Sequence, residues 1–113
     1  MHALYESNLT SLPLVSRGKV RDIYQVDAQH LLIVTTDRIS AYDAILPTPI
    51  PGKGRILTET ALFWMKKTQA LIPNQLVEKL SLADYLSTEE LAQIDGRGMI
   101  VKKLQPLPVE AIV

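Results

Sequence analysis

Residues 14–26 read Leu14-Val15-Ser16-Arg17-Gly18-Lys19-Val20-Arg21-Asp22-Ile23-Tyr24-Gln25-Val26, a run of β-forming residues interrupted by one basic triplet. The apolar residues before and after Arg17-Gly18-Lys19 predict two short strands joined by a tight turn. Gly18 is able to supply a positive φ angle if that turn requires one. The β-branched apolar run over residues 31–36 predicts a further strand after a polar break. The beginning of the chain is therefore expected to form β structure.

The middle of the chain changes from loop signals to a helical pattern. The alternating prolines of residues 47–51 lack backbone N–H groups, so this segment cannot lie inside a sheet, whereas residues 40–46 could hold a short strand. Between residues 55 and 71, apolar side chains recur every three or four positions, which predicts an amphipathic helix that stops at Pro73. We interpret the stripe as core-facing, and it consists of Leu57, Ala61, Trp64, Met65, Thr68, Leu71 and Ile72.

Shorter elements are predicted after this helix. Residues 75–82, 99–104 and 109–113 have strand patterns, and Ser87 is suited to cap one or two helical turns over residues 88–94. Few of the gaps between strands are long enough for a crossover helix, which disfavours a parallel sheet. The expected fold class is α+β, an antiparallel β-sheet with a helix packed on one face.

Composition limits the function classes. The 113 residues suffice for one small domain, and a hydrophobic content of 47% favours a folded core. Twelve Lys+Arg balance twelve Asp+Glu, which argues against a general nucleic-acid binder. The absence of cysteine excludes disulfides and thiolate metal sites. No signal peptide or membrane-length apolar run is present, so we expect a cytoplasmic protein that binds neither nucleic acid nor membrane.

The basic turn is the first candidate site. Lys and Arg side chains around a glycine can approach and neutralise the phosphates of a nucleotide. A solvated basic turn would have the same composition, and no Walker-type motif is present, so the spacing alone leaves both interpretations open. The cations and their glycine are Arg17, Gly18, Lys19 and Arg21.

Two further polar segments precede the predicted helix. Residues 37–43 read Asp-Arg-Ile-Ser-Ala-Tyr-Asp and could be a polar turn with a local pair between Asp37 and Arg38. Residues 51–55, which include Gly52 and Lys53, stand where backbone N–H groups at a helix N-terminus would bind an anion. A loop that uses its glycines only for geometry is the alternative.

The end of the chain offers weaker candidates. Lys102 and Lys103 follow an apolar strand and could meet the edge of a base or remain solvated. Glu110 stands in an apolar stretch, where a carboxylate needs a partner or a ligand. His2 and His30 lack further ligands at metal spacing and are assigned no site.

The order of these motifs is more specific than any one of them. The chain contains in succession Ser16 to Tyr24, Thr36-Asp37-Arg38-Ile39-Ser40-Ala41-Tyr42-Asp43, Ile50-Pro51-Gly52-Lys53-Gly54, Phe63-Trp64, Ile72-Pro73-Asn74 and Val101-Lys102-Lys103-Leu104. This succession, which covers nearly the whole chain, resembles the SAICAR synthetase (phosphoribosylaminoimidazole-succinocarboxamide synthase) family. The resemblance implies a ligase of purine biosynthesis that uses ATP and magnesium to join carboxyaminoimidazole ribonucleotide (CAIR) to L-aspartate. It also implies that this part of the chain is similar to the small lobe of protein kinases.

The resemblance implies roles for particular residues. The hairpin over the ATP phosphates would be formed by Arg17, Gly18, Lys19, Val20 and Arg21. Apolar walls around the base would come from Val15, Ile33 and Val101, and the connector against the adenine would be Lys102, Lys103 and Leu104. Glu110 would point toward the ribose or the mouth of the site. The ribonucleotide or aspartate side would be faced by Ser40, Asp43, Gly52 and Lys53.

The strand pattern over residues 109–113 runs to the last residue without a turn signal, which suggests a truncated N-terminal nucleotide-binding domain. On this interpretation, the magnesium ligands lie in an absent C-terminal part, the fragment is inactive alone, and the parent enzyme can form a homo-oligomer. Two alternatives stay open. One is a nucleotide-binding module that acts with a separate partner chain, and the other is a domain whose basic hairpin binds an acidic protein.

Overall fold

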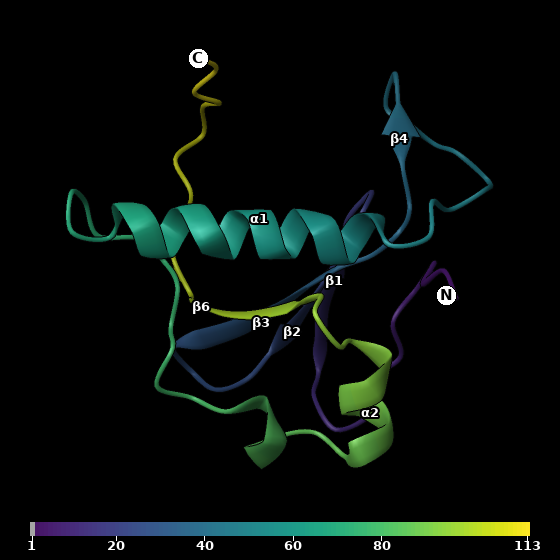
Figure 1. Ribbon diagram of the computed structural model, residues 1–113, viewed down its shortest axis with the longest axis horizontal. Helices are drawn as coiled ribbons and strands as arrows, with labels where there is room; N and C mark the ends of the chain where they lie inside the picture. Colours follow the sequence, from purple (N-terminus) through teal and green to yellow (C-terminus); the bar gives the residue numbers. More distant parts are fainter. Residues whose placement is uncertain (1) are drawn as a thin grey trace.

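The computed structural model describes residues 2–113. Its centre is a four-stranded antiparallel sheet in the order β1-β2-β3-β6, with one long helix on one face and the shorter helical segments on the other (Figure 1). The sheet strands are β1 (Leu14–Arg17), β2 (Arg21–Gln25), β3 (His30–Thr35) and β6 (Gly98–Lys102). The other elements are β4 (Ser40–Ala41), β5 (Ala44–Ile45), α1 (Lys53–Thr68), the 3-10 helix η1 (Leu82–Asp84) and α2 (Thr88–Gln93). The α+β prediction of an antiparallel sheet with a packed helix is confirmed.

The predicted hairpin forms as β1 and β2. Arg17 pairs with Asp22 across the ladder, and the Gly18 N–H group donates to the Arg21 carbonyl at 2.7 Å. Gly18 does not adopt a positive φ angle, because the only described glycines that do are Gly52 and Gly96. The turn therefore does not require the positive φ angle that Gly18 could supply.

Alternation along the strands gives the sheet two different faces. Tyr24, Leu32 and Ile100 are paired across β2, β3 and β6 and lie on the face toward α2. The buried residues of this core are Leu9, Tyr24, Leu32, Val34, Leu86 and Ile94. Ile23, Ile33 and Met99, which are adjacent in sequence to Tyr24, Leu32 and Ile100, lie on the opposite face, toward α1.

Helix α1 covers its face of the sheet incompletely. It begins at Lys53 and ends at Thr68, and its only buried residues are Gly54 and Thr58. Trp64 is 54% exposed, so its interpretation as a core residue is wrong. The indole and the Phe63 ring stand edge to face, with their ring centroids 5.1 Å apart.

Several shorter elements differ from expectation. Residues 40–46 form a small hairpin of two two-residue strands, and residues 75–82 contribute one isolated bridge between Leu76 and Val101. Residues 109–113 form no strand and are exposed. The Ser87 cap is confirmed, because Ser87 and Glu90 form a reciprocal capping box at the start of α2.

Candidate functional site

The cations of the hairpin are divided between the two faces of the sheet. The Arg17 guanidinium lies 2.6 Å from the Asp22 carboxylate, which is fully buried on the α2 face. Arg21 directly precedes Asp22, so its side chain projects from the opposite face, toward α1. The hairpin therefore cannot present Arg17 and Arg21 to the same anion, and the side chain of Arg17 has a structural role.

The side chain of Arg38 stabilises the turn of this hairpin through hydrogen bonds to its backbone. Its guanidinium is 2% exposed, lies 2.9 Å from Asp22, and donates to the carbonyl groups of Gly18 (2.9 Å) and Lys19 (2.8 Å). Burial raises the pKa of Asp22, but hydrogen bonds from Ser7 and Arg38 outweigh burial and leave the pKa below its ordinary value. Arg17 and Arg38 thus fix the base and the turn of the hairpin.

Asp37 does not pair with its neighbour Arg38, so the interpretation of residues 37–43 as a turn with a local pair between these two residues is wrong. The fully buried Asp37 carboxylate accepts hydrogen bonds from Arg97 (2.8 Å from Nη2), from the Gly54 N–H group (2.8 Å) and from the Leu4 N–H group (2.9 Å). Burial raises the pKa of Asp37, but these hydrogen bonds together outweigh burial and lower the pKa to about 2. The N-terminus of α1, which we predicted as an anion site, therefore already binds a carboxylate of the protein.

Two cations near the hairpin keep their charge available for a ligand. Within residues 2–113, Arg21 and Lys53 make no ion pair. Burial lowers the pKa of Lys53, the charge of Asp37 opposes this shift, and the charge of Arg21 adds to it. Arg21 pairs with Thr35 across the β2–β3 ladder, and Gly54, the residue after Lys53, packs against the Thr35 carbonyl, so the backbones that carry the two cations meet at Thr35. We call these two cations the Arg21–Lys53 pair.

Two hollows on the α1 face are lined by Arg21. A cavity of about 360 Å³ separates the sheet from α1, and its lining consists of Arg21, Ile33, Thr35, Leu57, Thr58, Ala61, Met65, Gln75 and Met99. A second hollow of about 300 Å³ lies against the hairpin and is lined by Gly18, Lys19, Val20, Arg21 and Ile23. Positive charge beside an apolar surface suits a ligand that has an anionic end and an apolar ring.

The segment between β3 and α1 contacts the β1–β2 hairpin through Lys19. Lys19 forms an ion pair with Asp43, whose backbone has a positive φ angle of 61° at the tip of the β4–β5 hairpin. This hydrogen bond lowers the pKa of Asp43. Ser40 lies in β4, and Gly52 is the N-cap of α1 with a φ angle of 83°. The structure thus brings Asp43 to the predicted phosphate hairpin and places the first turn of α1, which carries Lys53, against Thr35, the ladder partner of Arg21.

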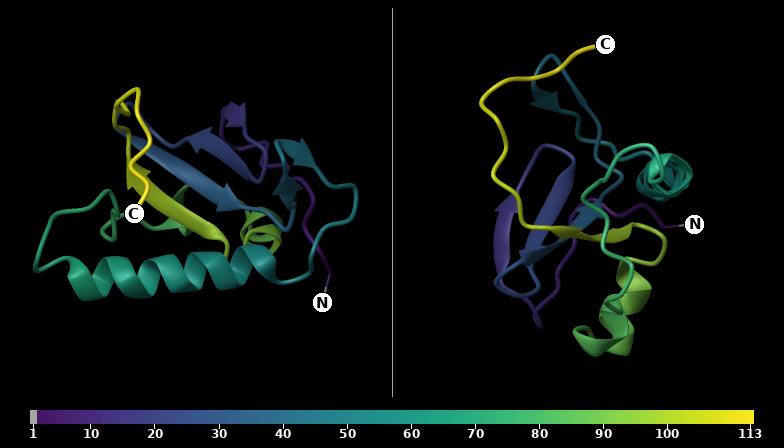
Figure 2. Two further views of the ribbon diagram at one scale, coloured as in Figure 1. Left: turned by 90° about the horizontal axis from the view of Figure 1, so that it is seen from above. Right: turned by 90° about the vertical axis from the view of Figure 1, so that its left-hand side faces the viewer.

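The predicted base-binding residues are spread along the sheet. Ile33 and Val101 share the α1 face, although Val101 is only 3% exposed, and Val15 lies half exposed at an irregularity of β1. The segment after β6 passes the sheet on the same side as α1 (Figure 2). Along it, Lys103 reaches Gln25 at 3.4 Å and Leu104 is exposed. Glu110 is also exposed, and no partner for its carboxylate occurs within residues 2–113.

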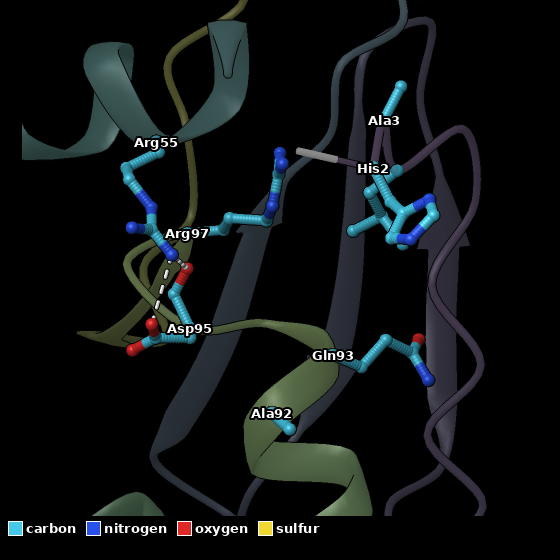
Figure 3. Close-up of a pocket in the computed structure, with 8 residues that line it drawn as sticks. His2, Ala3, Arg55, Ala92, Gln93, Asp95 and Arg97 are labelled. Carbon is cyan, nitrogen blue, oxygen red and sulfur yellow. Dashed lines mark hydrogen bonds and ion pairs between the residues drawn. The ribbon is translucent and has the colours of Figure 1, made fainter. Parts of the chain in front are cut away.

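Another cavity of about 360 Å³ lies near the N-terminus and is lined by His2, Ala3, Leu4, Arg55, Ala92, Gln93, Asp95 and Arg97 (Figure 3). Its two guanidinium groups are already paired, Arg55 with Asp95 at 2.9 Å and Arg97 with Asp37. It therefore offers less charge to an anion than the Arg21–Lys53 pair does. Among residues 2–113, no three His, Asp or Glu side chains are grouped to hold a metal ion. None of the helices in this part of the chain has the length and hydropathy of a membrane-spanning segment.

Comparison with known proteins gives a consistent result. A family model described as SAICAR synthetase matches residues 14–113. Proteins named phosphoribosylaminoimidazole-succinocarboxamide synthase from Nitrosomonas europaea and Thioalkalivibrio sulfidiphilus are 57% and 56% identical over 98% and 97% of the chain. The chain spans 37% of the length of each of these relatives.

Solved structures give the same family name. One is described as SAICAR synthase from Saccharomyces cerevisiae complexed with SAICAR. It is 43% identical, with a TM-score of 0.81 over 89% of this chain and 37% of that chain. A type-2 SAICAR synthetase in complex with ADP has a TM-score of 0.63 and 19% identity over 82% of this chain and 34% of that chain. At that identity, the type-2 structure shows a shared fold.

Proposed function

This chain belongs to the SAICAR synthetase family, and we propose from this that it is the nucleotide-binding part of a phosphoribosylaminoimidazole-succinocarboxamide synthase. That enzyme would be the ligase that joins CAIR to L-aspartate with ATP to give SAICAR, ADP and phosphate. Because the chain spans 37% of the length of its relatives, we expect the 113-residue chain to bind ATP without forming SAICAR.

The observation that carries the proposal is the Arg21–Lys53 pair. Two unpaired cations on the same face as an apolar cavity provide the charge that a triphosphate requires. In the proposed complex the hairpin of residues 17–21 covers the phosphates, and Arg21 and Lys53 neutralise them. Arg17 and Arg38 act indirectly, because they hold the hairpin in shape.

The base and the other substrates are assigned to neighbouring surfaces. We propose that the adenine lies on the α1 face of the sheet, between Ile33 and the connector of residues 101–104. Ser40, Asp43 and Gly52 would face CAIR or aspartate, and Glu110 would point toward the mouth of the site. Phosphoryl transfer depends mainly on such positioning and on charge stabilisation. Among residues 2–113, no three His, Asp or Glu side chains are grouped to hold Mg²⁺, and we propose that the magnesium ligands of the ligase lie outside these residues.

ATP titration by calorimetry tests the proposal. Arg21→Ala and Lys53→Ala should each weaken ATP binding by about 10-fold or more, since a hydrogen bond to a charged group contributes about 1.5–3 kcal/mol. Lys79→Ala is the matched control, because Lys79 is exposed, forms no ion pair within residues 2–113, and lies between α1 and η1. Equal affinities for all three variants and the wild type would contradict the proposed site.

A further inference from the structure

Lys53 and Arg21 belong to different elements, yet a phosphate group would have to contact both. Arg21 opens β2 in the middle of the sheet, whereas Lys53 is the first residue of α1. Helix α1 buries only two of its residues, so apolar packing holds it to the sheet weakly. Another interaction must therefore fix the first turn of the helix.

Asp37 makes this connection. Its Oδ1 atom accepts the Gly54 N–H group at 2.8 Å, and Gly54 directly follows Lys53. The same carboxylate receives both terminal nitrogens of Arg97, and it accepts the Leu4 N–H group at 2.9 Å. Asp37 thus ties the first turn of α1 to the segment before β6 and to the N-terminal segment.

The backbone around Asp37 is closely packed. The Arg97 carbonyl accepts hydrogen bonds from the Thr35 N–H group (3.0 Å) and from Thr58 Oγ1 (3.3 Å), which joins α1 to the end of β3. A Cβ atom on Gly54 would stand 2.9 Å from the Thr35 carbonyl carbon and closer still to its oxygen. The first turn therefore lies directly on the sheet backbone, and a small movement there would displace Lys53.

The negative charge of Asp37 also helps to keep Lys53 near Arg21. Without the carboxylate of Asp37, the buried guanidinium of Arg97 would lose its counter-ion near the Arg21–Lys53 pair. Three like charges would then repel one another in a region partly shielded from water. Lys53 has four rotatable side-chain bonds and could turn away from Arg21 to reduce this repulsion.

We propose that Asp37 is a positioning residue for nucleotide binding: through Gly54 and Arg97 it fixes the first turn of α1 and keeps Lys53 beside Arg21. This proposal rests on the proposed ATP site. Asp37 contacts no ligand itself, and its contribution to ATP affinity is exerted through Lys53. Loss of Asp37 should therefore remove the contribution of Lys53.

A double-mutant cycle on ATP affinity separates this role from a general effect on folding. Wild type, Lys53→Ala, Asp37→Asn and the double variant are titrated with ATP under conditions in which circular dichroism shows each to be folded. Each single substitution should weaken binding about 10-fold, and the double variant should be no weaker than either. The Asp37→Asn change keeps a side-chain oxygen for the Gly54 N–H group and removes the charge that holds Arg97.

Glu90→Gln is the matched control. Glu90 is a carboxylate that is 7% exposed and has hydrogen bonds from Ser11 and Ser87, and it lies on α2 on the other face of the sheet. Its removal should lower stability, leave ATP affinity unchanged and leave the effect of Lys53→Ala intact. If Asp37→Asn does not fold, Arg97→Lys takes its place, because it keeps the positive charge and loses the two-pronged contact.

The outcomes are distinct. If the two substitutions act independently, the double variant should bind ATP about 100-fold more weakly than the wild type. That result would overturn the positioning role of Asp37 but would still support the proposed ATP site. The positioning role would also be overturned if Lys53→Ala lost its effect on ATP affinity in the Glu90→Gln variant. Loss of any buried carboxylate would then have the same effect as loss of Asp37. Absence of ATP binding by the wild type would overturn the proposed function and this inference together.

Discussion

Replacement of Gly54 by alanine should destabilise the chain, although the same change inside a helix is ordinarily favourable. Alanine has a higher helix propensity than glycine by about 1 kcal/mol. At this position, however, the new methyl group would stand 2.9 Å from the Thr35 carbonyl carbon and close to the Arg97 guanidinium. To restore ordinary carbon–carbon contacts of about 3.5–4.0 Å, the first turn of α1 must retreat by roughly 1 Å.

The expected magnitude follows from what this retreat disrupts. A shift of that size lengthens the hydrogen bond from the Gly54 N–H group to Asp37, now 2.8 Å, beyond useful range. Loss of a buried hydrogen bond to a charged group costs about 1.5–3 kcal/mol, and overpacking costs about 1–3 kcal/mol. After the gain in helix propensity, the free energy of unfolding should fall by about 1.5–5 kcal/mol.

Urea denaturation followed by circular dichroism measures this change. Gly18→Ala is the matched control, because a Cβ atom there meets only the Arg21 carbonyl, at 3.4 Å, and the φ angle of Gly18 is not positive. The control should change stability by less than about 0.5 kcal/mol. An unchanged or higher urea midpoint for Gly54→Ala would refute the close seating of α1 on the sheet.

Two further predictions concern pH and the outer face of α1. Hydrogen bonds from Ser11 and Ser87 lower the pKa of Glu90 to about 2 from an ordinary 4.5, so its stabilising effect should be complete above pH 4.5 and disappear as the pH falls toward 2. Urea midpoints of Glu90→Gln should consequently vary less over this range than those of the wild type, and identical pH profiles would contradict the assignment. Because Trp64 is half exposed, Trp64→Ala should cost less than about 1 kcal/mol, and acrylamide should quench its fluorescence readily. A large loss of stability or a protected indole would show that this face is covered.

Local patterns in the sequence sufficed to predict much of the fold. The β1–β2 hairpin, β3, α1 and the Ser87 cap depend on residue spacing and on turn or capping residues within a few positions. The predicted strand over residues 109–113 also has a suitable spacing, but a strand exists only when another strand pairs with it. The spacing of α1 indicates an apolar stripe and does not determine whether a neighbouring element covers it.

Long-range pairing of charges could not be predicted in this way. Asp37 has a cation beside it in sequence, Arg38, yet its partner Arg97 is 60 residues away. The alternation of residues in β2 could have predicted one buried ion pair. It places Asp22 on the same face as the apolar Tyr24, and a buried carboxylate needs a cation as its partner. The division of Arg17 and Arg21 between two faces follows from the same alternation.

The central claim is that the phosphates of ATP bind at the Arg21–Lys53 pair on the α1 face. Titration of ¹⁵N-labelled chain with ATP, followed by amide chemical shifts, tests this claim most directly. The claim predicts that the largest shifts occur over residues 18–21 and 52–54, while α2 on the opposite face stays unchanged. Shifts confined to α2 or to the cavity beside His2 and Asp95, or no shifts at saturating ATP, would contradict it.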